Sequence, residues 1–208
     1  MGPVVTGHAT WFNAHGTLNC SFPPFTDWMV GAPSMARYYN AGEACGECLK
    51  VTGKRGTIVI RVVDSCPDCD TRDPVADLDL SQEAFKLVDD PNAGYVPITF
   101  QVVPCDVTGP MQYRFKDGST QYWTAIQVIN HREPIATVEY ADSKGNWINL
   151  PRTDYNFFIA DGGVGAHSQL SLRITSIYGQ VVVDTVNVTV GKNAIDSNTI
   201  FTGTQQFE

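Results

Sequence analysis

The chain has 208 residues, of which 43% are hydrophobic and 17% are charged, and its formal net charge is −8 at pH 7. This composition is typical of a folded globular protein with one large domain or two smaller ones. The negative charge argues against nucleic acid, anionic membranes and polyanionic substrates, whereas a neutral polymer is compatible with it. No apolar run approaches the roughly 20 residues of a membrane-spanning helix. The chain starts at Met1-Gly2-Pro3 without a charged-then-apolar leader, so we expect any secretion signal to be absent from this sequence.

Four apolar or alternating segments predict β-strands in the first half of the chain. They cover residues 7–12, 48–52, 57–63 and 98–103. Long irregular segments separate them, and non-local strands around one core are typical of a compact barrel. A short helix is also predicted over residues 34–39.

All of the cysteines lie in this first half: Cys20, Cys45, Cys48, Cys66, Cys69 and Cys105. Two CxxC pairs, Cys45–Cys48 and Cys66–Cys69, are separated by 17 residues, a spacing that also occurs in zinc ribbons. The even total and the Pro67-Asp68 inside the second pair favour three disulfides over zinc, and therefore an oxidising compartment. The sequence leaves the pairing open, and Cys66–Cys69 is the first bridge that we expect.

A dense acidic segment follows the third predicted strand. Six aspartates occur in sixteen residues: Asp64, Asp68, Asp70, Asp73, Asp77 and Asp79. Asp79 lies between two leucines, so we expect its carboxyl to be partly desolvated, with a raised pKa that suits an acid. The alternative is a polar surface loop held by the cysteines. The spacing lacks the glycine and closing glutamate of an EF-hand loop, and the histidines show no ligand spacing, so we expect no metal site.

A second short helix is predicted to begin after Ser81. Ser81 is the expected N-cap, Glu83 lies in the first turn, and Leu80 and Phe85 are placed to form a hydrophobic staple. The helix should run to about residue 89, because the residue before Pro91 disfavours helical backbone.

The second half of the chain alternates more regularly and predicts strands joined by turns. The strands are expected over 111–116, 122–129, 135–140, 147–150, 170–175 and 181–190, with an Asp117-Gly118 hairpin turn. This pattern favours a β-sandwich of immunoglobulin-like size. A turn-rich joint at 107–110 separates the halves. We therefore expect one domain over 1–106 and a second over 109–208.

Three aromatic residues of the second half do not fit a simple core. Tyr122 and Trp123 are neighbours, so in a regular strand only one of them could face inward. Tyr155 lies among polar and aromatic residues in the segment 154–158. Exposed aromatic rings on a sheet can stack on the apolar faces of sugar rings. The alternative is that all three are ordinary core residues.

Several motifs together resemble those of one known family. They are Gly7-His8-Ala9-Thr10-Trp11, Val63-Asp64, Asp77-Leu78-Asp79-Leu80-Ser81, Tyr122-Trp123-Thr124-Ala125-Ile126 and Asp154-Tyr155-Asn156. With these motifs the chain resembles an expansin of the bacterial, two-domain type, over nearly its whole length. The resemblance implies an all-β fold: a six-stranded double-psi β-barrel followed by an immunoglobulin-like β-sandwich that binds carbohydrate.

The resemblance also implies an activity and site residues. Expansins loosen plant cell walls by disrupting contacts between cellulose and matrix, without measurable hydrolysis. In that pattern Asp79 is the essential carboxyl of the barrel, with Thr10 and Asp64 beside it and Asp68 as the loop acid. The substrate-binding residues would be Trp11, Lys116, Tyr122, Trp123 and Tyr155. The first platform position is commonly Trp, so Tyr122 is a departure, as is the plant-like cysteine count.

Enzymatic alternatives remain open. An inverting endoglucanase on a related barrel needs an acid and a base about 6.5–9.5 Å apart, yet residues 12–26, where the base would lie, contain no carboxylate. A lytic transglycosylase needs only one acid and is the more credible enzyme. A pure glycan-binding module is the third reading.

We therefore predict a secreted, extracellular protein that loosens plant cell walls and needs no cofactor. Its expected partners are cellulose and related wall glucans, with no nucleic acid and no membrane, and we expect a monomer.

Overall fold

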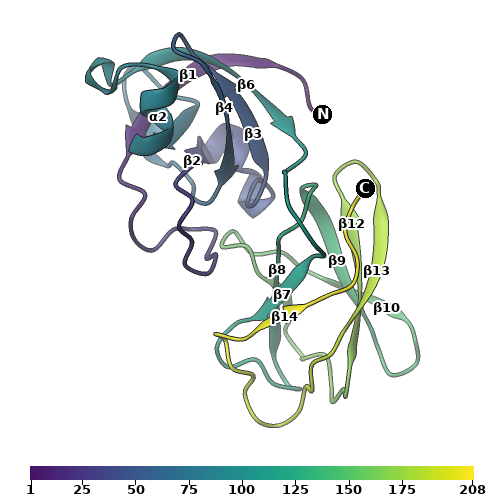
Figure 1. Cartoon of the computed structure of the whole chain (residues 1–208). Coiled ribbons are helices and arrows are strands. Elements are labelled where there is room, and N and C mark those ends of the chain that lie inside the picture. The colour runs from purple at the N-terminus through teal and green to yellow at the C-terminus, as the bar shows by residue number, and fades with distance from the viewer. The chain divides into compact units, whose positions relative to one another are not determined.

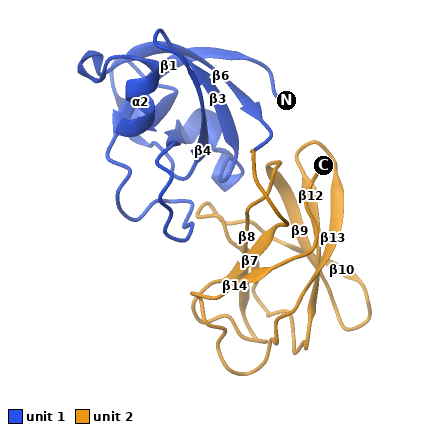
Figure 2. Ribbon diagram, viewed as in Figure 1, with its two compact units in different colours: residues 1–105 blue, residues 106–208 orange.

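The computed structural model describes all residues from Met1 to Glu208. The chain forms two compact units, Met1–Cys105 and Asp106–Glu208, which are drawn in blue and orange in Figure 2. β-Strands dominate both units (Figure 1). No helix is both long enough and apolar enough to cross a membrane.

The first unit is a closed six-stranded barrel with the strand order β1-β5-β2-β4-β3-β6. Its strands are β1 (Val5–Phe12), β2 (Val30–Pro33), β3 (Cys48–Thr52), β4 (Thr57–Val62), β5 (Leu78–Ser81) and β6 (Val96–Val103). The pairs β1–β5 and β2–β4 are parallel, whereas the other neighbours are antiparallel. The barrel interior is filled by apolar side chains such as Val51, Val62 and Leu80. The closed all-β barrel expected from the sequence is therefore present.

Two barrel strands, β2 and β5, are not among those predicted from the sequence. β2 has the sequence Val-Gly-Ala-Pro, whose glycine and proline disfavour a strand prediction. β5 is only four residues long and includes a carboxylate, so its sequence alone does not predict a strand. Both strands are buried along their whole length. Barrel closure, rather than local propensity, determines their structure.

The helices of this unit are short: η1 (Met35–Tyr39), η2 (Asn40–Gly42), α1 (Asp68–Thr71), α2 (Gln82–Val88) and η3 (Pro91–Ala93). The predicted cap of α2 is confirmed, because the Ser81 hydroxyl accepts a hydrogen bond of 3.0 Å from the Ala84 backbone N–H. The helix ends at Val88, close to the expected position. The predicted helix over 34–39 corresponds to η1.

Every cysteine is in a disulfide. The pairs are Cys20–Cys45, Cys48–Cys105 and Cys66–Cys69. The expected Cys66–Cys69 bridge is confirmed. The four CxxC cysteines belong to three different bridges, so the zinc-ribbon alternative is wrong for this oxidised fold.

The second unit contains two four-stranded sheets, with the orders β10-β9-β12-β13 and β11-β8-β7-β14. The first comprises β9 (Ile135–Ala141), β10 (Trp147–Leu150), β12 (Leu170–Ser176) and β13 (Val181–Val186). The second comprises β7 (Gln112–Phe115), β8 (Thr124–Ile129), β11 (Phe158–Ala160) and β14 (Ile200–Thr202). Residues of both sheets share one apolar core, including Phe115, Ile126, Val138, Leu172 and Val186.

Three features of this unit differ from the sequence prediction. Tyr122 and Trp123 precede β8, because Thr120 N–H donates to the Trp123 carbonyl over 2.7 Å and forms a local turn. The predicted strand over 181–190 ends at Val186, where the Val188 N–H turns back to the Val186 carbonyl. The three-residue strands β11 and β14 were not predicted, since such short segments lack a detectable alternation.

Candidate functional site

Asp79 is at the centre of strand β5, between β1 and β2. Its Cα pairs with that of Thr10 on β1 and with that of Ala32 on β2. Leu78 and Leu80 belong to the barrel core, and side chains alternate along a strand, so Asp79 points out of the barrel. It is nevertheless only 8% exposed. The segment around Cys66 and Arg72 contacts this carboxyl and accounts for part of its burial.

The Asp79 carboxyl is held by a hydroxyl and a guanidinium. Thr10 Oγ1 donates a hydrogen bond of 2.6 Å to Asp79 Oδ1. Arg72 Nη1 donates a hydrogen bond of 2.7 Å to the same Thr10 hydroxyl, and Arg72 Nη2 lies 3.8 Å from Asp79 Oδ2. The structure thus brings together Thr10 and Asp79, as expected for the barrel site, and adds Arg72.

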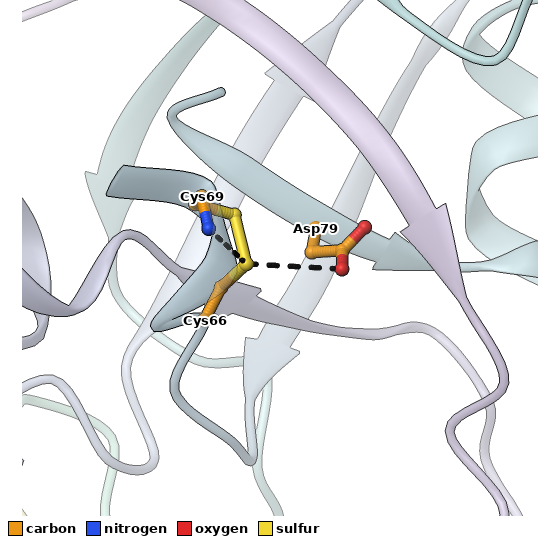
Figure 3. Close-up of side chains that lie close together, drawn as sticks. All are labelled: Cys66, Cys69 and Asp79. Atoms are coloured by element: carbon orange, nitrogen blue, oxygen red, sulfur yellow. Dashed lines mark hydrogen bonds between the residues drawn. A yellow bond between two sulfur atoms is a disulfide. The ribbon is translucent and has the colours of Figure 1, made fainter. Parts of the chain in front are cut away.

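The Cys66–Cys69 disulfide lies against this carboxyl (Figure 3). Cys66 Sγ is 3.8 Å from Asp79 Oδ2 and accepts a hydrogen bond of 3.1 Å from the Cys69 backbone N–H. The possible ligand atoms of Cys66, Cys69 and Asp79 all lie within 4.8 Å of one another. Both thiols are consumed in the disulfide, however, and thiolate is the form that binds metal. The disulfide therefore provides an apolar wall beside Asp79.

Burial raises the pKa of Asp79 above its ordinary value. The hydrogen bond from Thr10 and the positive charge of Arg72 lower this pKa, whereas the negative charges of Asp68 and Asp64 raise it further. The net direction is upward, which agrees with the expectation from its two leucine neighbours. A carboxyl of this kind retains its proton to a higher pH than an exposed aspartate does and is suited to donating it.

Asp64 and Asp68 differ in their surroundings. Asp64 Oδ1 accepts backbone hydrogen bonds from Asn19 over 2.8 Å and from Ser65 over 2.9 Å. Its pKa is raised by burial, and these two bonds act in the opposite direction. Asp68 is exposed at the start of α1. Both carboxylates influence Asp79 through their charge.

The remaining acids of the segment fall into two groups. Asp70 and Asp77 form ion pairs with Arg37 of η1, at 3.4 Å and 2.6 Å. Asp77 also accepts a hydrogen bond of 2.8 Å from the His8 backbone N–H, which ties it to β1. Asp73 is exposed. Asp70 and Asp77 therefore have structural partners, and only part of the acidic segment faces Asp79.

Sequence reasoning missed Arg72. It is the only cationic residue between Asp64 and Asp79, a signal that could have suggested a partner for one of the buried carboxyls. Trp11, which follows Thr10 on β1, is 38% exposed. Its indole N–H donates a hydrogen bond of 3.1 Å to the Pro91 carbonyl, which fixes an exposed ring next in sequence to Thr10.

The second unit has its own cluster of aromatic and basic side chains. Lys116 directly follows β7, and its backbone N–H pairs with the Ala125 carbonyl of β8 over 3.0 Å. Because Phe115 faces the core, Lys116 lies on the outer side of the sheet. Its Nζ is 5.6 Å from the ring centroids of both Tyr155 and Phe157. The structure therefore brings Lys116 and Tyr155 together.

The other two expected aromatics differ in exposure. Tyr122 is 62% exposed, whereas Trp123 and Tyr155 are half-buried. None of the three belongs to the apolar core of the second unit, so the reading of all three as core residues is wrong.

Known proteins resemble this chain in sequence and in fold. A protein-family model described as lytic transglycolase matches residues 32–100, which span β2 to β6. Expansin-like protein 2 of Dictyostelium discoideum is 35% identical over 192 residues, covering 88% of this chain and 46% of the relative. Expansin-YoaJ of Bacillus subtilis is 38% identical over 142 residues, covering 68% of this chain and 58% of the relative. The chain thus spans about half the length of these two relatives.

Solved structures extend the likeness to both units. The apo expansin of Clavibacter michiganensis has a TM-score of 0.83 and 31% identity, with 99% of this chain and 98% of that chain covered. An aspartate-to-asparagine mutant of the same expansin, in complex with cellohexaose, has a TM-score of 0.84, 30% identity and the same coverage. The closed six-stranded barrel is of the double-psi type. The chain belongs to the expansin family.

Proposed function

We propose that this protein binds cellulose and related plant cell-wall glucans and loosens their contacts without hydrolysing glycosidic bonds. The observation that carries the proposal is the near-complete match, at a TM-score of 0.84, to an expansin mutant in complex with cellohexaose. The match covers 99% of this chain and so includes both units. A neutral glucan also suits a protein whose formal net charge is −8, since no phosphate or anionic lipid needs to be attracted.

In this proposal the two units have different roles. Residues 1–106 form the acting barrel, with Asp79, Thr10, Asp64 and Asp68 along the glucan and Trp11 contacting it. Residues 109–208 form an immunoglobulin-like sandwich that binds carbohydrate. Its stacking residues are Tyr122, Trp123 and Tyr155, with Lys116 at the edge of the rings. The 62% exposure of Tyr122 and the position of Lys116 over the Tyr155 ring support this assignment.

The proposed absence of hydrolysis is supported by the lack of a carboxylate in the segment where a base would lie. Inversion needs a second carboxylate that activates a water on the opposite face of the sugar, about 6.5–9.5 Å from the acid. No carboxylate occurs from Phe12 to Thr26, the segment that continues from β1 beyond Thr10. Asp64 accepts two backbone N–H groups on Oδ1, which fix the orientation of its carboxylate.

One second candidate deserves a test of its own, because the matched family model is described as lytic transglycolase. Such a reaction needs a single acid, and Asp79, with its raised pKa, could supply it. Release of soluble fragments from purified peptidoglycan, abolished by Asp79→Asn, would favour this candidate over the wall-loosening function.

We further propose that the protein is extracellular. Its three disulfides require an oxidising compartment to form and persist, and secretion provides one.

The test is a pull-down on crystalline cellulose with reducing sugar measured in the same sample. The proposal expects the protein in the pellet and no sugar above the protein-free control. Linear release of sugar that Asp79→Asn abolishes would instead identify a hydrolase. A protein that stays in the supernatant would exclude cellulose as its binding partner.

A further inference from the structure

Arg72 contacts Thr10 and Asp79 in the barrel site, although it is not one of the site residues expected from the sequence. It caps the C-terminus of α1, with its backbone N–H donating to the Asp68 carbonyl over 3.0 Å. Its Nε donates to the same carbonyl over 3.1 Å. Because both bonds share one acceptor, the guanidinium plane is fixed relative to the segment that the Cys66–Cys69 disulfide closes. Nη1 is thereby directed at Thr10, whereas Nη2 donates to Cys66 Sγ over 3.7 Å and lies 3.8 Å from Asp79 Oδ2.

The direction of the bond between Thr10 and Asp79 follows from the chemistry of its neighbours. A threonine hydroxyl has one proton to donate, whereas a guanidinium can only donate. Arg72 Nη1 donates to Thr10 Oγ1, so an acceptor lone pair of that hydroxyl is occupied. The hydroxyl proton is free to go to Asp79 Oδ1, 2.6 Å away. Since only one lone pair of Oγ1 is left, donation to Oδ1 is favoured over acceptance from it, and Oδ2 is then the oxygen that carries a proton taken up by Asp79.

The structure assigns Arg72 the role of the positioning residue of this site: it favours Thr10 as donor to Asp79 Oδ1 and thereby favours Oδ2 as the oxygen that carries the acidic proton of Asp79. Without Arg72, the Thr10 hydroxyl could rotate and accept a bond from a protonated Oδ1. Both protonation patterns of Asp79 would then be populated. The inference rests on the proposed role of Asp79 as the acting carboxyl of the barrel.

The charges around Asp79 predict the direction in which the pKa of Asp79 shifts when Arg72 is removed. Arg72 is the positive charge that faces the carboxyl, and Asp64 and Asp68 are the negative ones. Loss of Arg72 removes the positive charge that stabilises the ionised carboxylate of Asp79 and leaves the two negative charges that destabilise it. It also removes the constraint that makes Thr10 a donor to the carboxylate. Both changes raise the pKa of Asp79.

The experiment is a carbon-13 NMR titration of the Asp79 carboxyl in the full chain, with the resonance assigned by its loss in Asp79→Asn. In Arg72→Met the midpoint should move upward, and in Arg72→Lys, which keeps the charge, it should move less. Arg55→Met is the matched control, because Arg55 forms an exposed pair with Asp90 at 3.1 Å in the same unit. The control should leave the Asp79 midpoint unchanged.

The Thr10→Val variant separates two ways in which Arg72 can affect the pKa of Asp79: through the Thr10 hydroxyl, or directly through its charge. If Arg72 acts partly through Thr10, the shift caused by Arg72→Met should be smaller in a Thr10→Val background than in the wild type. Equal shifts in both backgrounds would overturn the action through Thr10. A folded Arg72→Met protein with an unmoved Asp79 midpoint would overturn the positioning role and leave Arg72 a structural cap of α1.

Should Arg72→Met fail to fold, the comparison of Arg72→Lys with Arg55→Lys still decides the question. Lysine cannot donate to Asp68 and Thr10 in the same fixed fork. The Asp79 midpoint should therefore shift in Arg72→Lys alone, and no shift would refute the assignment. The titration does not depend on wall-loosening activity, so its failure is distinguishable from a failure of the proposed function.

Discussion

Thr10 and Asp79, which are 69 residues apart in sequence, are joined by a buried 2.6 Å hydrogen bond across the parallel strands β1 and β5. The bond places a carboxyl with a raised pKa on the outer face of the barrel, against the Cys66–Cys69 disulfide. Its position requires the closed barrel, since neither strand alone would bring the two residues together.

The first prediction concerns the pH dependence of stability. Burial raises the pKa of Asp79 in the fold, so the folded state holds this proton more tightly than the unfolded chain does. The ionisation of Asp79 therefore lowers the free energy of unfolding as pH rises from the unfolded value through the folded pKa. The Asp79→Asn variant has no carboxyl to ionise at this position, so its free energy of unfolding does not fall for this reason. Its free energy of unfolding relative to the wild type should increase with pH across that window and level off above it.

Denaturant unfolding of both proteins over a series of acidic pH values measures this difference. Asp64, whose pKa is also raised by burial, is present in both proteins and so largely cancels. A difference that does not change with pH would contradict the raised pKa of Asp79.

A second prediction separates the two arginines, Arg37 and Arg72, that contact carboxylates of the acidic segment. Arg37 pairs with Asp70 and Asp77 and also donates to the Ala76 carbonyl. Arg37→Met leaves two carboxylates without this partner and should lower the free energy of unfolding by about 1–3 kcal/mol. The Asp79 titration should stay near that of the wild type, unlike in Arg72→Met. If Arg37→Met moves the Asp79 midpoint as far as Arg72→Met does, the division of the acids into two groups is wrong.

A third prediction concerns the cysteines. The denatured, unreduced protein should show no free thiol and should be lighter than the reduced form by six hydrogen atoms. Peptide mapping should recover the Cys20–Cys45 and Cys48–Cys105 bridges as linked peptides. Free thiols together with stoichiometric zinc would contradict this pairing.

The fourth prediction addresses the proposed binding of glucan by the second unit. Trp123→Ala and Tyr155→Ala should each weaken binding to cellulose by about 0.5–1.5 kcal/mol, because stacking area is lost. Tyr178→Ala is the matched control, since Tyr178 is a 42% exposed aromatic that follows β12 of the other sheet. Depletion isotherms on crystalline cellulose measure the change, and added salt should have little effect because stacking is not screened. A loss of several kcal/mol of stability with unchanged binding would show that the altered ring has a packing role instead.

Much of the fold was predictable where the local pattern was strong. β3 and β10 agree with their predicted bounds because their alternation and flanking turns are clear. β2 and β5 were not predictable, since their structure depends on barrel neighbours that lie far away in sequence. The pairing of Cys48 with Cys105 was not predictable for the same reason. Strands β3 and β6 bring the two residues together, with Cys48 in register with Val103.

The candidate site was predictable in part. Asp79 was identifiable from its apolar neighbours, and Thr10 from a resemblance rather than from its own chemistry. Arg72 was not identified, because its role depends on the turn that follows α1 and on the fork that it forms toward β1. Long-range contacts of this kind leave no periodic signal in the sequence.

The measurement that tests the central claim most directly is the extension of a heat-inactivated plant cell wall under constant load, with soluble sugar assayed in the bathing solution. The wild-type protein should increase extension without releasing sugar. Asp79→Asn should bind the wall as the wild type does and cause no extension, because in the proposed function the second unit supplies affinity and the barrel carboxyl supplies the action. Extension that appears only together with released sugar, or that persists in a folded Asp79→Asn protein, would contradict the account.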